Sequence, residues 1–450
     1  MQQIDFSQGS IRRRILAVAT PMLIAQLLNL LYNIVDRIYI GKIPGEGTLA
    51  LASIGLCFPF VTLITAFANL FGLGGAPLCA MARGKGNREG AQGIMVNAGF
   101  MLLLSGAVLT VLGIAFHRPL LYLFGASEIT YPYASSYIVI YLLGTLCVML
   151  SLGLNPYINC QGFARTGMLT VALGAAANIV LDPIFIFALH LGVRGAAIAT
   201  VLSQFLSAAW VVKFLTGKKA ELKLNFRGFR PDWHCIQRIT VLGIASFVMS
   251  FTDMLVQVAC NSMLRGFGGD LYISVMTVLN SVRQIAQTPV LAIADGASTA
   301  ISYNYGARLY RRTRDAIRFM TQIAIGYTML VWMLVSLFPA LFIRIFNQDA
   351  ELVAAAVPAL HIYFFGFVMM AFQYSGQSTF RALGRAKYAV FFSLLRKAFI
   401  VVPLTLLLPY CWNLGVSGVF AAEPVSNCIG GLACYFTMRH VVMPELKMEN

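Results

Sequence analysis

The sequence predicts an all-α polytopic membrane protein, with twelve transmembrane helices arranged as two pseudo-symmetric lobes of six helices each. Three observations predict this class. The 450 residues are 59% hydrophobic and only 11% charged, whereas about a quarter of the residues in soluble domains are charged. The apolar stretches are long enough for about twelve bilayer crossings at ~20 residues each. Finally, the second half of the chain repeats short motifs of the first half.

Stretches without charged residues mark the expected helices. In the first lobe, residues 1–216, they lie at 15–40, 50–82, 91–116, 131–155, 166–189 and 194–216. A basic cytoplasmic linker at residues 217–235 follows. In the second lobe, residues 236–450, the expected helices lie at 236–263, 271–301, 316–340, 352–378, 388–410 and 415–438, before a short C-terminal tail.

The internal repeat supports this division. Tyr141-Leu-Leu-Gly144 recurs as Tyr363-Phe-Phe-Gly366, and Gly192-Val-Arg-Gly195 recurs as Gly415-Val-Ser-Gly418, at nearly the same offset. Because six is an even number, both copies would have the same orientation in the membrane. Two-lobed repeats of this kind are typical of alternating-access carriers, which bind their substrate between the repeats.

The basic residues predict the orientation. With the N-terminus in the cytoplasm, 24 Lys and Arg residues fall on the inner side, six on the outer side and three within the spans. Cytoplasmic loops carry such an excess of basic residues. We therefore expect a multi-pass protein of the cell membrane with both termini in the cytoplasm, and we attribute the net charge of +16 to topology rather than to nucleic-acid binding.

Five of the 17 acidic residues fall within expected helices, and they are Asp36, Asp182, Asp253, Asp295 and Glu423. An ionised carboxylate at the centre of a bilayer costs at least ~2.5–3.5 kcal/mol. Such residues therefore face a cavity and take part in function, or they form ion pairs. For Asp36 the ion pair is a real alternative, since Arg37 is its neighbour.

Asp182 lies in the segment Asn178-Ile-Val-Leu-Asp182-Pro183. The spacing of four residues places the Asn178 amide and the Asp182 carboxylate on one face of a helix. Oxygen ligands of this kind suit a hard cation such as Na⁺, and the carboxylate can instead take a proton. The alternative is a hydrogen-bonded residue at a bend beside Pro183.

Several motifs resemble those of the MATE (multidrug and toxic compound extrusion) family, and most closely its bacterial MepA-like branch. They cover essentially the whole chain. They are Val35-Asp36-Arg37, Ala177-Asn178 through Asp182-Pro183, Gly192-Val-Arg-Gly195, Tyr303-Asn304-Tyr305-Gly306-Ala307, Phe380-Arg-Ala-Leu-Gly384, and Gly415-Val-Ser-Gly418 with Glu423-Pro424.

The resemblance implies a carrier that exports organic cations in exchange for Na⁺ or H⁺ by alternating access. It also implies a first-lobe site at Asp36, Asn178, Asp182 and Thr200, where the coupling cation, Na⁺ or H⁺, would bind. It implies no bound cofactor. The expected partners are small aromatic organic cations and the lipid bilayer. Two lobes in one chain need no second copy, so we expect a monomer.

The second lobe departs from the first at the matching positions. Under the repeat, Asp36 corresponds to Asn261 and Asp182 corresponds to Leu404. The first lobe would therefore hold the ion site, and the polar residues of the second lobe would have another function. Other branches of the family place coupling carboxylates in helices 7 and 10, but here helix 10 offers only glutamines. A second polar site would then draw on Asp253, Asp295, Glu423, Gln373 and Gln377.

Two other functions are weighed against export. A lipid or lipid-linked saccharide flippase of the same superfamily is the alternative, although such relatives often have more helices and a basic central cavity. Only Arg283, Arg396 and Lys397 are basic residues within the expected spans. A membrane enzyme is not expected, because the sequence contains no HExxH, GxSxG or P-loop motif.

Overall fold

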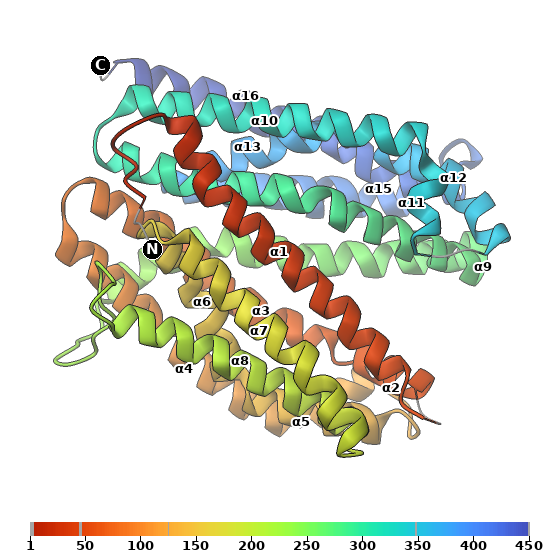
Figure 1. Cartoon of the computed structure of the whole chain (residues 1–450). Helices are drawn as coiled ribbons and strands as arrows, with labels where there is room; N and C mark the ends of the chain where they lie inside the picture. Colours follow the sequence, from red (N-terminus) through yellow and green to blue (C-terminus); the bar gives the residue numbers. More distant parts are fainter. Residues whose placement is uncertain (1–3, 45–46, 125, 347–348, 449–450) are drawn as a thin grey trace. The chain divides into compact units, whose positions relative to one another are not determined.

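The computed structural model describes residues 4–44, 47–124, 126–346 and 349–448, and in these ranges the regular structure is entirely helical (Figure 1). Contacts divide the chain into two compact units. The first comprises Met1–Asp5 and Thr20–Gly243, and the second comprises Phe6–Ala19 and Ile244–Asn450. The start of the chain thus packs with the second half, where the Arg312 guanidinium donates to the carbonyl oxygen of Gly9 at 2.9 Å.

The first half contains eight α-helices and one short π-helix, η1, among the described residues. They are α1 (Ile11–Gly41), α2 (Gly47–Gly55), α3 (Phe58–Gly84), α4 (Arg88–Leu123), α5 (Tyr131–Leu143), α6 (Thr145–Cys160), α7 (Ala164–Pro183), η1 (Ile184–Ala188) and α8 (Gly192–Thr216). The helix α9 (Trp233–Gly306) continues from this half into the next and is interrupted by non-helical geometry at Gly269.

The second half continues with helices that pack around α13 and α16. They are α10 (Tyr310–Leu337), α11 (Pro339–Arg344), α12 (Ala350–Phe364), α13 (Met369–Ala382), α14 (Ala386–Leu394), the π-helix η2 (Leu395–Val401), α15 (Val402–Leu407), the 3₁₀ turn η3 (Cys411–Asn413) and α16 (Val416–Met448).

The predicted membrane fold is confirmed. Among the described residues, eight helical segments are long and apolar enough to cross a bilayer, and two bent helix pairs would add one crossing each. The two other expected spans, 271–301 and 415–438, are also helical and lie in the second part of α9 and in α16. They contain buried polar and charged side chains, including Glu423, which lower their hydropathy.

Two expected helices, at 131–155 and 352–378, are not straight. The first is bent by 56° between α5 and α6, and the second by 49° between α12 and α13. Both bends coincide with the repeated Tyr-x-x-Gly motif. A β-carbon on Gly144 would lie 2.6 Å from the Val201 side chain of α8, and one on Gly366 would lie 2.7 Å from Pro424 of α16. Glycine therefore lets another helix approach each bend closely.

Glycines also bring α3 and the start of α9 together within the first unit. A β-carbon on Gly74 would lie 2.8 Å from the Cα of Gly243, and one on Gly243 would lie 1.8 Å from the carbonyl oxygen of Leu70. Small residues allow this close backbone approach between membrane helices.

Replacing Gly243 by alanine is expected to destabilise the first unit by about 1–3 kcal/mol, the usual cost of overpacking. The physical reason is that the Leu70 carbonyl belongs to the backbone of α3 and cannot move without shifting the helix. The measurement is the melting temperature of the purified protein in detergent.

Gly93→Ala is the matched control, because a β-carbon on Gly93 of α4 has no neighbour within 4 Å. An equal melting temperature for the two variants would contradict the proposed close contact.

Candidate functional site

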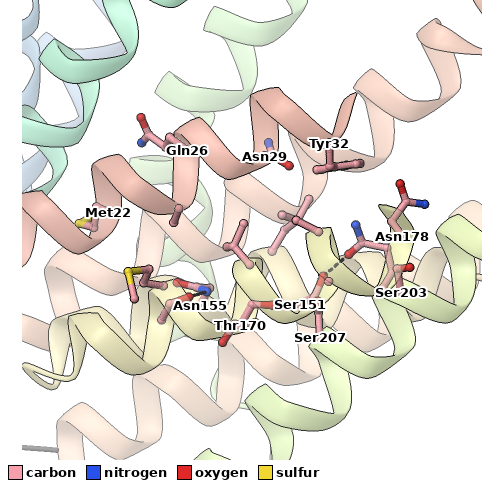
Figure 2. Close-up of a pocket in the computed structure, with 18 of the residues that line it drawn as sticks. Met22, Gln26, Asn29, Tyr32, Ser151, Asn155, Thr170, Asn178, Ser203 and Ser207 are labelled. Atoms are coloured by element: carbon pink, nitrogen blue, oxygen red, sulfur yellow. Dashed lines mark hydrogen bonds between the residues drawn. The ribbon is translucent and has the colours of Figure 1, made fainter. Parts of the chain in front are cut away.

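The first unit contains a cavity of about 190 Å³ between α1, α6, α7 and α8, lined by polar as well as apolar side chains. Figure 2 shows the labelled side chains of α1 on one side and those of α6, α7 and α8 on the other. On α1, Gln26, Asn29 and Tyr32 follow one another at intervals of three residues, which keeps them on one face. The opposite wall contributes the buried hydroxyl groups of Thr170, Ser203 and Ser207.

A second cavity of about 260 Å³ lies toward the C-terminal end of α1. It adjoins the first, because Tyr32, Thr200 and Gln204 line both. Its wall is aromatic and contains both a carboxylate and a guanidinium group. The residues that give it this character are Tyr32, Phe58, Tyr137, Tyr141, Asp36 and Arg37.

Asn178, Asp182 and Thr200 lie together beside these cavities, where Thr200 lines both, Asn178 lines the first and Asp182 lines neither. The Asn178 side-chain amide donates to Oδ1 of Asp182 at 3.2 Å and lies 3.5 Å from the Thr200 hydroxyl. Asn178 and Asp182 occupy adjacent turns of α7, as their spacing predicts, whereas Thr200 comes from α8. Asp182 is fully buried, and Asn178 is 1% exposed.

Asp36 of α1 completes this group. Its carboxyl group lies beside that of Asp182, close enough for the two groups to interact directly. Oδ1 of Asp36, Oδ1 of Asn178 and Oδ2 of Asp182 are buried, and none of these oxygens has a hydrogen-bond donor within the described parts of the chain. Three buried oxygens without donors can accept a hard cation or a proton.

Arg37 interacts electrostatically with Asp36 and so places a positive charge near this group of oxygens. The Arg37 guanidinium lies 5.0 Å from the ring centroid of Phe58, while Asp36 faces Asp182. After Pro183, the chain continues as the π-helix η1. Single π turns are frequent at functional sites, and this one directly follows Asp182.

The second unit has a buried cluster of charges. The Glu423 carboxylate lies 2.9 Å from Arg283, 3.1 Å from Arg396 and 3.4 Å from Lys397, and Lys397 also pairs with Asp253 at 2.9 Å. Arg396 and Lys397 lie in the π-helix η2 and are almost completely buried. Three bases face two acids here, so each of the two carboxylates has a positive neighbour.

The five second-lobe residues that the sequence singles out do not form one group. Asp253 and Glu423 meet through Lys397. Asp295 instead lies 3.9 Å from the Arg381 guanidinium. The side-chain amide of Gln373 donates to that of Gln377 at 3.4 Å, and Gln377 donates to Ser393.

The sequence analysis did not assign several polar residues to a site. It noted Arg283, Arg396 and Lys397 as bases within spans but did not pair them with Glu423. Because a buried charge needs a partner, three bases and two acids in neighbouring spans were a usable signal. The polar stripe from Gln26 to Asp36 at helical spacing was another.

Comparison with known proteins places this chain among transporters. The model of a family described as MatE matches residues 21–184 and 245–407, once in each half of the chain. The multidrug export protein MepA of Staphylococcus haemolyticus is 24% identical over 436 residues, which cover 97% of this chain and 95% of the relative. An FAD transporter of Shewanella oneidensis is 25% identical over 447 residues, which cover 96% of each chain.

Solved structures give the same fold. A multidrug resistance transporter of the MATE family, in its outward-facing conformation, superimposes with a TM-score of 0.92 at 24% identity and covers 100% of this chain and 99% of its own. A transporter of the MOP superfamily from Pyrococcus furiosus superimposes with a TM-score of 0.92 at 24% identity over 99% of both chains. At this identity, the likeness shows the fold.

Proposed function

Because the chain belongs to the MatE family of membrane transporters, we propose that it exports organic cations across the cytoplasmic membrane in exchange for Na⁺ or H⁺. The coupling cation would bind at Asp36, Asn178, Asp182 and Thr200. The observation that carries this proposal is the trio of buried oxygens, from Asp36, Asn178 and Asp182, that lack a donor among the described residues.

Electrostatics explains why this site would take a cation. Two carboxylates with full charge about 4 Å apart repel by ~4 kcal/mol at an effective dielectric constant of ~20. A proton between Asp36 and Asp182 relieves this repulsion, and so does Na⁺ held by the carboxylates. The free carbonyl oxygen of Asn178 and the Thr200 hydroxyl can supply neutral ligands to Na⁺.

The organic cation would use the adjoining cavities. Drug-sized ligands occupy pockets of roughly 300–1,000 Å³, and neither cavity alone reaches this range, but the two volumes together fall within it. The tyrosines at 32, 137 and 141 offer ring faces to a flat cation, and Asp36 offers a negative charge. The substrate and the coupling ion would therefore compete for one negative site that includes Asp36, or for two conformations of the carrier.

This competition would drive exchange by alternating access. An ion shifts a conformational equilibrium only if it binds the two states with different affinities. Asp36 lies on α1, whereas Asp182 and Thr200 lie on α7 and α8, so a cation bound by all three ties these helices together. We infer that entry of the ion from outside draws α1 toward α7 and displaces the drug.

The test is efflux of ethidium from proteoliposomes under separately imposed gradients. External Na⁺ at equal pH, or external acid without Na⁺, is expected to raise the rate at least several-fold over that of protein-free liposomes. An ionophore that collapses the effective gradient should abolish the increase. Efflux that responds to neither gradient, for ethidium and for other organic cations, would contradict ion-coupled export and favour a flippase.

The distribution of basic residues supports an orientation with both termini in the cytoplasm. The linker after α8, with its many lysines and arginines, would then lie on the cytoplasmic side, in accordance with the positive-inside rule. Both proposed cavities lie within the first unit of a single chain. We therefore infer that a monomer is sufficient for transport.

A further inference from the structure

We propose that the C-terminal end of α8 carries a binding site for an anionic phospholipid. A cavity of about 780 Å³ lies there, between the end of α8 and the start of α7. It is separate from the two cavities described above, because it shares none of their lining residues. Its volume is within the range of sites for drug-sized molecules, so it has room for a lipid headgroup.

The charge of this cavity is positive. Lys213, Lys218 and Lys219 line it, and none of the three forms an ion pair within the described part of the chain. The acidic residue nearest in sequence, Glu221, pairs with Arg83 instead. Three ammonium groups without a protein counter-ion attract a phosphate group.

The start of α7 adds to this attraction. Phe163, the N-cap residue of α7, and Thr166 in its first turn both line the cavity. The N-terminus of an α-helix carries a partial positive charge and favours phosphate. The lysines and the helix end come from different parts of the chain, so two independent features favour an anion at the same place.

The apolar part of the cavity identifies the anion as a lipid rather than a soluble phosphate. Phe163 and Phe214 pack edge to face with ring centroids 5.2 Å apart, and Trp210 is 36% exposed beside them. Leu202, Leu206 and Trp210 recur every four residues and are all exposed, so they form a stripe along one face of α8.

This stripe runs from the apolar part of α8 to Lys213 near its end. An acyl chain can lie along the stripe while its headgroup reaches the lysines, and tryptophan is enriched at this boundary between membrane and water. Basic pockets between membrane helices bind anionic lipid headgroups. A soluble phosphate would leave the exposed apolar stripe unused.

The test uses Trp210 as a reporter. The purified full-length protein is titrated, in detergent micelles, with bromine-labelled phosphatidylglycerol or with bromine-labelled phosphatidylcholine at the same mole fraction. We expect the anionic lipid to quench tryptophan fluorescence with at least threefold higher apparent affinity. The Trp210→Phe variant should lose most of this quenching, which assigns it to the pocket and not to the three other tryptophans.

Two triple variants separate the pocket from the general charge of the linker. The pocket variant combines Lys213→Gln, Lys218→Gln and Lys219→Gln. Its apparent affinity for phosphatidylglycerol should fall at least threefold. The control variant combines Lys223→Gln, Arg227→Gln and Arg230→Gln. It removes the same amount of charge from the linker, and the affinity for phosphatidylglycerol should change by less than twofold. All six side chains are exposed, so both variants should fold, and equal melting temperatures confirm it.

Three outcomes would overturn the proposal. One is equal quenching by the anionic and the zwitterionic lipid, which indicates non-specific contact with the bilayer. Another is an equal loss of affinity in the two triple variants, which indicates attraction by the linker as a whole. The third is displacement of the labelled lipid by soluble glycerol phosphate at comparable concentration, which assigns the pocket to a soluble phosphate.

Discussion

Replacing Asp182 by asparagine is expected to lower gradient-driven ethidium efflux at least tenfold, close to the rate of protein-free liposomes. The variant keeps the shape of the side chain but removes one of the two carboxylates of the proposed cation site. The remaining Asp36 then lacks the repulsion that favours uptake of a cation. Without a bound cation that distinguishes the two conformations, the ion gradient cannot drive exchange.

A second measurement separates loss of ion binding from loss of folding. A ligand that binds only the folded protein raises its melting temperature by mass action, so the coupling ion should stabilise the natural protein but not the Asp182→Asn variant. Glu128→Gln is the control, because Glu128 is exposed in the loop before α5, where it accepts a hydrogen bond from Tyr122. If Asp182→Asn retained more than half of the coupled efflux, the proposed ion site would be wrong.

Replacing Glu423 by glutamine is expected to destabilise the second unit by about 3–5 kcal/mol, the usual cost of removing one partner from a buried ion pair. The carboxylate lies within 3.4 Å of three basic side chains. Without it, only Asp253 opposes Arg283, Arg396 and Lys397. At ~2–4 °C per kcal/mol for a unit of this size, the melting temperature should fall by roughly 10 °C.

A double variant tests whether the unbalanced charge of the cluster causes the loss of stability in Glu423→Gln. Adding Lys397→Gln to Glu423→Gln restores the original net charge of the cluster and should recover part of the lost melting temperature. Glu445→Gln is the control in the same unit, since the pair of Glu445 with Arg385 is about 30% exposed and exposed pairs contribute at most ~1 kcal/mol. If the melting temperature fell equally in the single and the double variant, packing rather than charge would determine the loss of stability.

The sequence by itself determined the class of this protein and the repeat of its two halves, and it supplied the residues of the proposed cation site. Long apolar runs can only be buried by spanning a bilayer as helices, so composition and periodicity were sufficient for the class. The spacing of Asn178 and Asp182 was equally informative, because residues four apart on a helix always share a face.

Only the tertiary structure decided which side chains of different helices contact one another. The sequence did not show that Asp36 of α1 would face Asp182 while Arg37 turns to Phe58, nor that Glu423 would be surrounded by three bases. It also did not show which tyrosines line a cavity, or that the helices at 131–155 and 352–378 bend at their glycines. Helical periodicity fixes the face on which a residue lies, but the rotation and approach of each helix depend on packing against its neighbours.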